Sequence, residues 1–250
     1  MDYIMIGAGG TGSHLSGPLY AYLKALEDKD KEWHLFIADG DTVEEKNLIR
    51  QNFSAGDIMR NKAAALVERM HDTPHTQAIE VYIGPENIAA KIRDGDVVLI
   101  AADNYYVRRL IEQHALTLQN LVVINGGNEA IDGTIQLWVR EAGKNLTPRI
   151  THMHPEIEAA IDAKQDRSAL SCADIAKLPG GEQTIIANMT SATFMLAALY
   201  RYHHKYHLTK SEPGITSWTD LSFDHKAGTV LPWDARNTKG WEQDRISPII

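Results

Sequence analysis

Ten residues near the start of the chain, Tyr3-Ile4-Met5-Ile6-Gly7-Ala8-Gly9-Gly10-Thr11-Gly12, pass from an apolar run directly into a glycine-rich turn. Leucine and tyrosine then recur at helical spacing over residues 13–27. A strand, a glycine turn and a helix in this order let backbone N–H groups and a helix N-terminus meet a phosphate. The stretch therefore predicts a turn that binds a nucleotide-like anion.

The regions that follow repeat this alternation of an apolar run and a helical pattern. Strands are predicted at 33–38, 76–83, 97–101 and 121–124, and helices at 61–71, 88–93 and 105–118. The strands are apolar without alternation, which is typical of a parallel sheet buried on both faces. The first half is therefore predicted to form a parallel α/β sheet.

Beyond Gly133 the pattern changes. Residues 134–140 alternate like an antiparallel strand, 145–181 have no strong period, 183–202 are helical, and 215–231 suggest a hairpin. We expect a single α/β domain over 1–250, with a Rossmann-like, mostly parallel sheet extended by antiparallel strands and a long crossover loop. Its halves are expected to be 1–132 and 133–250.

Composition narrows the class of protein. Twenty-five Lys and Arg against 33 Asp and Glu give a formal net charge of −8, which argues against binding nucleic acid or an anionic membrane. No signal peptide or membrane span is recognisable. The single cysteine excludes an intramolecular disulfide and a zinc site built from several cysteines, which fits a reducing cytoplasm.

The glycine turn alone does not separate nucleotide-binding enzymes from one another. Asp39, at the end of the second predicted strand, could bind ribose hydroxyls in an NAD-dependent dehydrogenase equally well. The longer motif that follows distinguishes them, and its parts are Asp39-Gly40-Asp41-Thr42-Val43-Glu44, Asn47-Leu48-Ile49-Arg50-Gln51, Lys62 before an alanine run, and Asp103-Asn104. This pattern resembles the ThiF/MoeB/HesA family, the adenylating domain shared with ubiquitin-activating enzymes. The resemblance is strong over residues 3–140 and weaker over 165–200.

The resemblance implies ATP and Mg²⁺ as cofactors. Arg50 and Lys62 would hold the phosphates, Asn47 and Gln51 would donate hydrogen bonds, and Asp103 would place Mg²⁺, while Asp39 or Asp41 would bind the ribose. The implied nucleotide-binding set is Gly7, Gly9, Gly10, Gly12, Asp39, Asp41, Asn47, Arg50, Gln51, Lys62, Asp103 and Asn104. Such a cluster suits nucleotidyl transfer, in which positioning and neutralisation of growing negative charge do most of the catalysis.

Cys172 is the candidate for a covalent step. It lies in the 145–181 segment, where relatives often carry a cysteine that accepts sulfur or the carrier protein. A thiolate is nucleophilic near neutral pH, and Arg167 and Lys177 could lower the pKa of the thiol. The alternative is a small buried apolar residue.

Two features of the family are absent from this sequence. One cysteine cannot supply the tetrathiolate zinc site of many relatives, so no structural zinc is expected. The chain also starts at the first strand, without the helical arm whose arginine reaches the partner subunit's ATP in many relatives. Arg108, Arg109 or Arg60 could substitute, or a partner chain could supply the arginine.

The remaining candidates are expected to be structural. The aromatic residues Trp218, Phe223, Trp233 and Trp241 are expected to be core or packing residues and not a recognition surface. His203 and His207 have helical i, i+4 spacing but no carboxylate at a ligand spacing, and with His152 and His154 they are not expected to bind a metal.

The sequence thus favours ATP-dependent adenylation of the C-terminal carboxylate of a ubiquitin-like or sulfur-carrier protein with a Gly-ended tail, followed by thioester transfer to Cys172. The half 133–250 would bind the carrier, in a homodimer, with a conjugating enzyme as a possible further partner in a bacterial ubiquitin-like pathway. The alternatives are an enzyme like the tRNA threonylcarbamoyladenosine dehydratases, against which the acidic balance counts, and a non-catalytic adapter.

Overall fold

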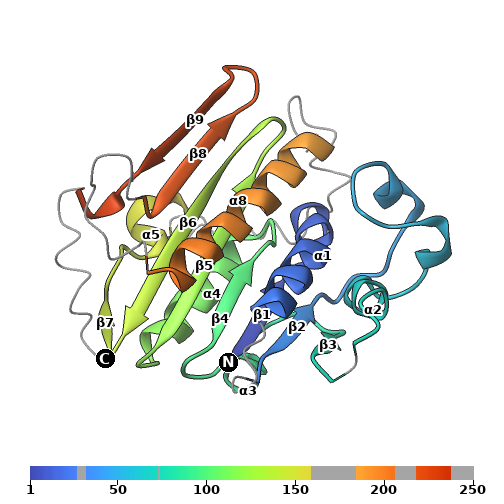
Figure 1. The fold of residues 1–250 in the computed structure, drawn as a ribbon, viewed down its shortest axis with the longest axis horizontal. Coiled ribbons are helices and arrows are strands. Elements are labelled where there is room, and N and C mark those ends of the chain that lie inside the picture. Colours follow the sequence, from blue (N-terminus) through green and yellow to red (C-terminus); the bar gives the residue numbers. More distant parts are fainter. Residues whose placement is uncertain (27–31, 73, 159–183, 206–217, 238–250) are drawn as a thin grey trace.

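The computed structural model of this 250-residue chain describes residues 1–26, 32–72, 74–158, 184–205 and 218–237. Within these ranges nine strands form one sheet, in the order β3-β2-β1-β4-β5-β6-β8-β9, with β7 paired to β6 (Figure 1). The strands are β1 (Asp2–Ile6), β2 (His34–Ala38), β3 (Thr76–Ile79), β4 (Val97–Ile100), β5 (Leu121–Asn128), β6 (Asp132–Glu141), β7 (Lys144–Asn145), β8 (Asp220–Asp224) and β9 (Thr229–Trp233).

The helices in the described ranges cover both faces of this sheet. The α-helices are α1 (Gly10–Ala25), α2 (Lys62–Glu68), α3 (Ile88–Lys91), α4 (Tyr105–Leu116), α5 (Ile150–Met153) and α8 (Ile185–His203), and the 3₁₀ helices are η1 (Glu45–Ile49), η2 (Ala55–Asp57) and η5 (Ala235–Asn237). None of them combines the length and the apolar character that a bilayer span requires.

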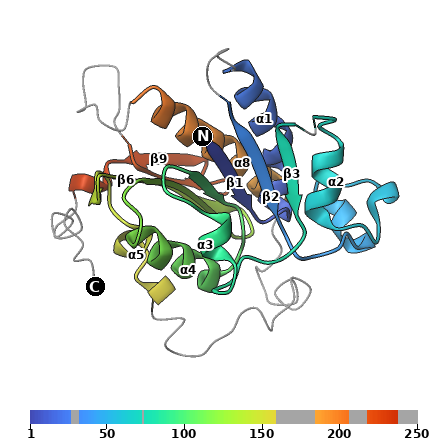
Figure 2. The same ribbon diagram turned by 90° about the horizontal axis from the view of Figure 1, so that it is seen from below.

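Two apolar cores lie on opposite faces of the sheet. Alternate residues of β1 point to opposite faces, so that Tyr3 and Met5 join α1, α2 and α8 in one core, while Ile4 and Ile6 face α3, α4 and α5 in the other. Figures 1 and 2 show these two helical layers, with α1 and α8 side by side on one face. Burial of the strands on both faces explains why their sequences are continuously apolar.

The first five strands are parallel and the rest antiparallel, which confirms the predicted fold class. The prediction that the strand at 121–124 stops at Asn125 is wrong. β5 continues to Asn128 because β6 folds back along it and pairs with it from Leu121↔Arg140 to Asn128↔Gly133.

The aromatic residues of the C-terminal region divide into two groups. Trp218 and Phe223 are buried, as predicted. Trp233 is not a core residue: it is 55% exposed, because β9 pairs only with β8 in the described structure and presents exposed side chains throughout. Trp241 lies outside the described residues.

The order of the strands in the sheet determines where a ligand-binding crevice is expected. β1 pairs with β2 on one side and with β4 on the other, so the chain leaves β1 toward one edge and later returns to its opposite side. A ligand crevice is expected outside the carboxyl ends of the strands at such a switch point. Gly7, Asp39 and residues 101–104 follow these three strands.

Candidate nucleotide-binding site

The glycine loop between β1 and α1 has no room for a side chain at Gly7, Gly10 or Gly12. A Cβ on Gly12 would lie 1.9 Å from the carbonyl oxygen of Gly7, and a Cβ on Gly10 would lie 2.5 Å from the amide of Asn188. Gly7 itself has a φ of +95°. Helix α1 begins at Gly10, inside the motif, and no described side chain caps its start. Its first-turn N–H groups are therefore placed to meet an anion.

Asp39 fixes the shape of this loop. Its two carboxylate oxygens accept hydrogen bonds from the backbone N–H groups of Ala8, at 2.6 Å, and Asp41, at 2.8 Å. Burial raises the pKa of Asp39, although these two N–H donors and nearby Lys62 stabilise the carboxylate and oppose that rise. Asp39 therefore joins the end of β2 to the glycine loop while it lines the cavity.

Asp41, Lys62 and Tyr82 form a second polar group on the cavity wall. The ammonium of Lys62, at the first position of α2, lies 2.9 Å from a carboxylate oxygen of Asp41, and the Tyr82 hydroxyl donates to the other oxygen. Burial alone would raise the pKa of Asp41, but the hydrogen bonds from Tyr82 and Lys62 outweigh it and hold that pKa below its ordinary value. Lys62 is buried, so its charge acts inside the cavity with little screening.

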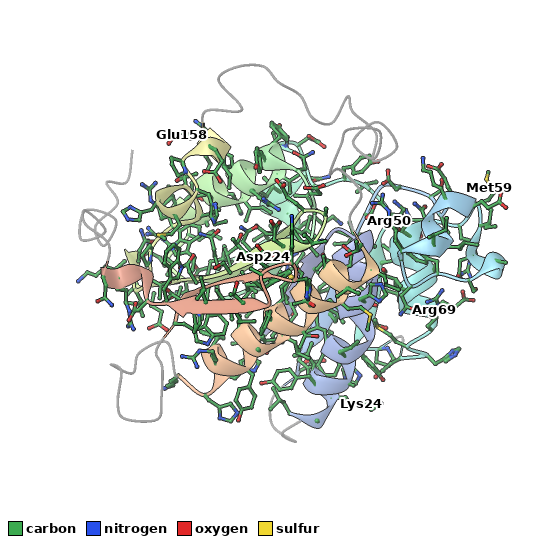
Figure 3. All side chains as sticks on the ribbon, turned by 90° about the horizontal axis from the view of Figure 1, so that it is seen from above. Lys24, Arg50, Met59, Arg69, Glu158 and Asp224 are labelled. Atoms are coloured by element: carbon green, nitrogen blue, oxygen red, sulfur yellow. The ribbon has the colours of Figure 1, made fainter. Side chains whose placement is uncertain are left out.

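Arg50 and Gln51, which follow η1, also line the cavity. The main-chain carbonyl of Arg50 accepts from the side chains of His14 and Asn188, and Figure 3 shows Arg50 between the α1–α8 pair and the η1 region. Gln51 is 6% exposed, and its amide oxygen has no hydrogen-bond partner within the described structure. A buried amide oxygen costs free energy unless it accepts a hydrogen bond, so this oxygen could accept one from a group bound in the cavity.

Asp103, Asn104 and Arg108 form the wall beyond β4. Asp103 is exposed, whereas the side chain of Asn104 caps α4 by accepting from the N–H groups of Tyr106 and Val107. The guanidinium of Arg108 is buried and donates to the carbonyls of Ala102 and Gly126, each at 3.3 Å.

Most of the predicted site residues meet in this one cavity. Those that line it are Gly7, Gly9, Gly10, Asp39, Asp41, Arg50, Gln51, Lys62, Asp103 and Asn104. Gly12 lies behind the loop, in contact with Gly7. Asn47 is buried in η1, where its side-chain oxygen accepts from the N–H of Glu44, and it is not among the lining residues.

The three arginines considered above as possible ATP-contacting residues, Arg108, Arg109 and Arg60, lie in different places. Arg108 lines the cavity. Arg109 binds Glu158, and Arg60 binds Asp57 and Glu68, so both are engaged elsewhere. Of these three, Arg108 alone contributes to the cavity wall.

Sequence reasoning missed a hydrogen-bonded chain that joins the site to α8. Thr11 and Asn128 line the cavity, and the side chain of Asn128 donates to Asn188 in α8. The only sequence signal for Asn188 is that it is a polar residue within the apolar 185–200 run. That signal does not predict which residues its side chain contacts.

The remaining candidates lie outside the described residues or away from this cavity. Cys172, Arg167, Lys177 and His207 lie outside the described residues. His203 is bonded to two tyrosines, Tyr3 and Tyr22. Among the residues that the structure describes, no three His, Cys, Asp or Glu side chains are grouped so that they could hold a metal ion.

A glycine loop at a switch point, with a buried lysine and an arginine on the same cavity, is typical of nucleotide-binding α/β proteins. The chain belongs to the ThiF family, whose model matches residues 1–175. It is 30% identical over 143 residues to the adenylyltransferase and sulfurtransferase UBA4 of Yarrowia lipolytica, and 26% identical over 134 residues to the SAMP-activating enzyme E1 of Haloferax volcanii. These alignments cover 56% and 52% of this chain but 34% and 46% of the relatives, so the chain matches less than half of each.

Solved structures agree on the fold. E. coli MccB with ATP superposes with a TM-score of 0.65 at 18% identity, covering 99% of this chain and 64% of that one. PaaA superposes with a TM-score of 0.63 at 14% identity, covering 94% of this chain and 64% of that one. At these identities the likeness shows the fold alone.

Proposed function

We propose that this protein adenylates the C-terminal carboxylate of a ubiquitin-like or sulfur-carrier protein at the expense of ATP. The observation that carries the proposal is one cavity lined by the glycine loop together with Arg50, Gln51, Lys62 and Asp103. The relatives named adenylyltransferase and SAMP-activating enzyme, and the ATP-bound MccB structure, support it.

The residues of the cavity suit the charge that this reaction develops. A carrier carboxylate attacks the α-phosphorus, the bond to the bridging oxygen breaks, and pyrophosphate leaves while an acyl adenylate forms. Arg50 and Lys62 would neutralise the phosphates, and the N–H groups at the start of α1 would bind phosphate oxygens. The catalytic contribution of the protein is therefore positioning and electrostatic stabilisation, without a protein nucleophile in this first step.

Mg²⁺ fits the donor set of the cavity. Magnesium in phosphate-transfer sites is commonly held by one or two carboxylates together with substrate phosphates and water. Asp103, exposed on the cavity wall, would supply the protein carboxylate, and the ion would screen charge on the phosphates.

The later steps rest on the sequence. The Cys172 thiolate would attack the acyl carbon of the adenylate, the acyl–phosphate bond would break, and AMP would leave as the thioester forms. The carrier would need a flexible Gly-ended tail to reach the α-phosphate. Homodimerisation, a conjugating enzyme as partner and a cytoplasmic location belong to the same proposal.

ATP–pyrophosphate exchange with purified candidate carriers tests the adenylation step. Exchange is expected only with a carrier whose tail ends in Gly, and Asp103→Asn should slow it by about 10²–10³-fold because charge stabilisation in the transition state is lost. Asp224→Asn is the matched control, because Asp224 is the last residue of β8, accepts hydrogen bonds from the N–H groups of Lys226 and Ala227, and is not among the residues that line the cavity. Exchange with tRNA alone would instead support the RNA-directed alternative, and no exchange with any substrate would support the adapter.

The thioester step has its own test. Cys172→Ala should still catalyse exchange but should lose a thiol-sensitive covalent adduct with the carrier. Unchanged adduct formation would overturn the role of Cys172 and leave the adenylation proposal intact.

A further inference from the structure

A polar side chain in the first turn of α8 is completely buried. Asn188 is 0% exposed, and helix α8 packs against α1 through mainly small and apolar residues. A buried amide costs free energy unless its hydrogen bonds are made. The partners of Asn188 therefore indicate why an asparagine occupies this position.

Asn188 connects α8 to two separate parts of the nucleotide-binding site. Its side-chain oxygen accepts from Nδ2 of Asn128 at 2.8 Å, and its Nδ2 donates to the main-chain carbonyl of Arg50 at 3.3 Å. Asn128 in turn accepts from the hydroxyl of Thr11 at 2.9 Å. One chain of hydrogen bonds thus joins the glycine loop, the end of β5, α8 and the residue after η1.

The carbonyl of Arg50 is held from two helices. Nε2 of His14 in α1 lies 3.2 Å from the same oxygen, and since a carbonyl can only accept, the ring must donate from Nε2. Next to Arg50, the N–H of Asn52 donates to the hydroxyl of Ser13 at 2.9 Å. The main chain here is therefore fixed between α1 and α8, while the side chains of Arg50 and Gln51 line the cavity.

Gly10 shows how closely Asn188 is fitted to the site. A Cβ at Gly10 would lie 2.5 to 2.7 Å from three atoms of the Asn188 side chain. The glycine at this position therefore leaves room for the amide as well as for an anion. One glycine of the motif, Gly10, is therefore needed for the packing of the loop against α8.

We propose that Asn188 is a positioning residue of the nucleotide site, and that its amide places the Arg50 guanidinium by holding the Arg50 main chain. The inference rests on the proposed function in so far as Arg50 binds ATP phosphates. Asn188 itself does not line the cavity and acts through Arg50. Helix α8 is then part of the apparatus that positions ATP, in addition to covering the sheet.

A double-mutant cycle measured by ATP binding in the presence of Mg²⁺ tests the proposal on the full chain. Asn188→Ala should weaken ATP binding about tenfold, the size of one well-placed hydrogen bond. In an Arg50→Ala background the same change should have little further effect, because the guanidinium it positions is gone. A tenfold loss that persists in that background would overturn the proposal in favour of a general packing role.

Two further variants separate this contact from loosening of the helix. Thr190→Ala removes another polar contact of α8, to His225 in the β8–β9 turn, and should leave ATP affinity unchanged. Asn188→Ser retains a small polar group but is too short to reach both partners, so it should resemble Asn188→Ala and serve where the alanine variant does not fold. Equal losses from Thr190→Ala and Asn188→Ala would contradict the specific role.

Amide hydrogen exchange provides a readout that needs no nucleotide. Residues 50–53 should exchange faster in Asn188→Ala than in the wild type, while β1 and β4 should be unaffected. Unchanged exchange at 50–53 would show that Asn188 does not hold this segment. If the wild-type protein fails to bind ATP, the proposed function is wrong. Amide hydrogen exchange would then still show by itself whether Asn188 holds residues 50–53 in place.

Discussion

Helices α1 and α8 lie side by side, and the polar groups at their two ends are arranged differently. Where both helices begin, Asn188 of α8 packs on Gly10, and the uncapped start of α1 faces the cavity. Where both end, His203 of α8 is enclosed by aromatic residues, with its two ring nitrogens 3.1 Å from the Tyr3 hydroxyl and 2.9 Å from the Tyr22 hydroxyl.

The difference separates residues that serve binding from residues that serve stability. At the cavity end, the N–H groups and cations face space that a ligand can fill. At the far end, the polar atoms satisfy one another, and the ring of His203 stacks on Tyr22 with centroids 5.6 Å apart. Substitutions at the cavity end should therefore impair nucleotide binding, and substitutions at the far end should change the free energy of unfolding.

The largest effect is expected at Gly12. Gly12→Ala would put a Cβ 1.9 Å from the Gly7 carbonyl, so the start of α1 must move away from β1. We expect a loss of about 3 kcal/mol or more in the free energy of unfolding, together with loss of ATP binding. Urea unfolding and ATP titration measure both.

Gly17→Ala is the control within the same helix. Apart from its chain neighbours and the backbone of its own helix, no atom of the described residues lies within 4 Å of a Cβ at Gly17, and the free energy of unfolding should change by no more than about 1 kcal/mol. Normal ATP binding by Gly12→Ala would mean that the loop tolerates displacement and that the cavity end is less constrained than the structure indicates.

The contact between Asn188 and Arg50 marks the limit of what the sequence alone predicts. The motif order predicted the parallel strands and most of the cavity wall, because apolar runs and glycine spacing are local signals. Asn188 and Arg50 are 138 residues apart, and their contact depends on how α8 packs. The Asn125-Gly126-Gly127-Asn128 run was expected to end the strand predicted at 121–124, yet pairing with β6 extends that strand to Asn128. Trp233 is large and apolar, which favours burial, but it lies on β9, which pairs only with β8 in the described structure, and its side chain is 55% exposed.

A smaller, purely functional effect is expected at Lys62. Lys62→Met keeps the length of the side chain but removes the charge that lies 2.9 Å from Asp41. ATP affinity should fall at least tenfold, because a buried cation near phosphates is poorly screened. Stability should change by only about 1 kcal/mol, since the Asp41 side chain is 48% exposed and can remain hydrated.

The matched lysine is Lys46, which pairs with Glu44 at 2.8 Å on the surface and does not line the cavity. Lys46→Met should leave ATP affinity unchanged. If the two variants lose affinity equally, the effect comes from the overall charge of the protein and the assignment of Lys62 to the site is wrong.

The far end of the helix pair should respond to pH. Burial, helped by neighbouring His204, lowers the pKa of His203 from 6.5 to about 4, and burial raises the pKa of Tyr22 to about 12, so the cluster is neutral at pH 7. Because the folded pKa of His203 lies below the unfolded value, its contribution to stability is complete above pH 6.5 and is lost as the pH falls toward 4. His203→Phe should be less stable at pH 7, where both tyrosines lose a partner, but its stability should fall less on acidification.

Urea unfolding at pH 7 and pH 4.5 measures this difference between variant and wild type. Between pH 7 and pH 4.5, the wild type should lose about 1–2 kcal/mol more of its free energy of unfolding than His203→Phe does. This figure allows for the partial exposure of His203, which reduces the effect. His154→Phe, which replaces a histidine paired with exposed Glu156, controls for the loss of one histidine. ATP affinity at pH 7 should be unchanged in His203→Phe. A loss of ATP affinity there would show that the two ends of the helix pair are coupled through α8, and the division between a binding end and a stabilising end would no longer hold.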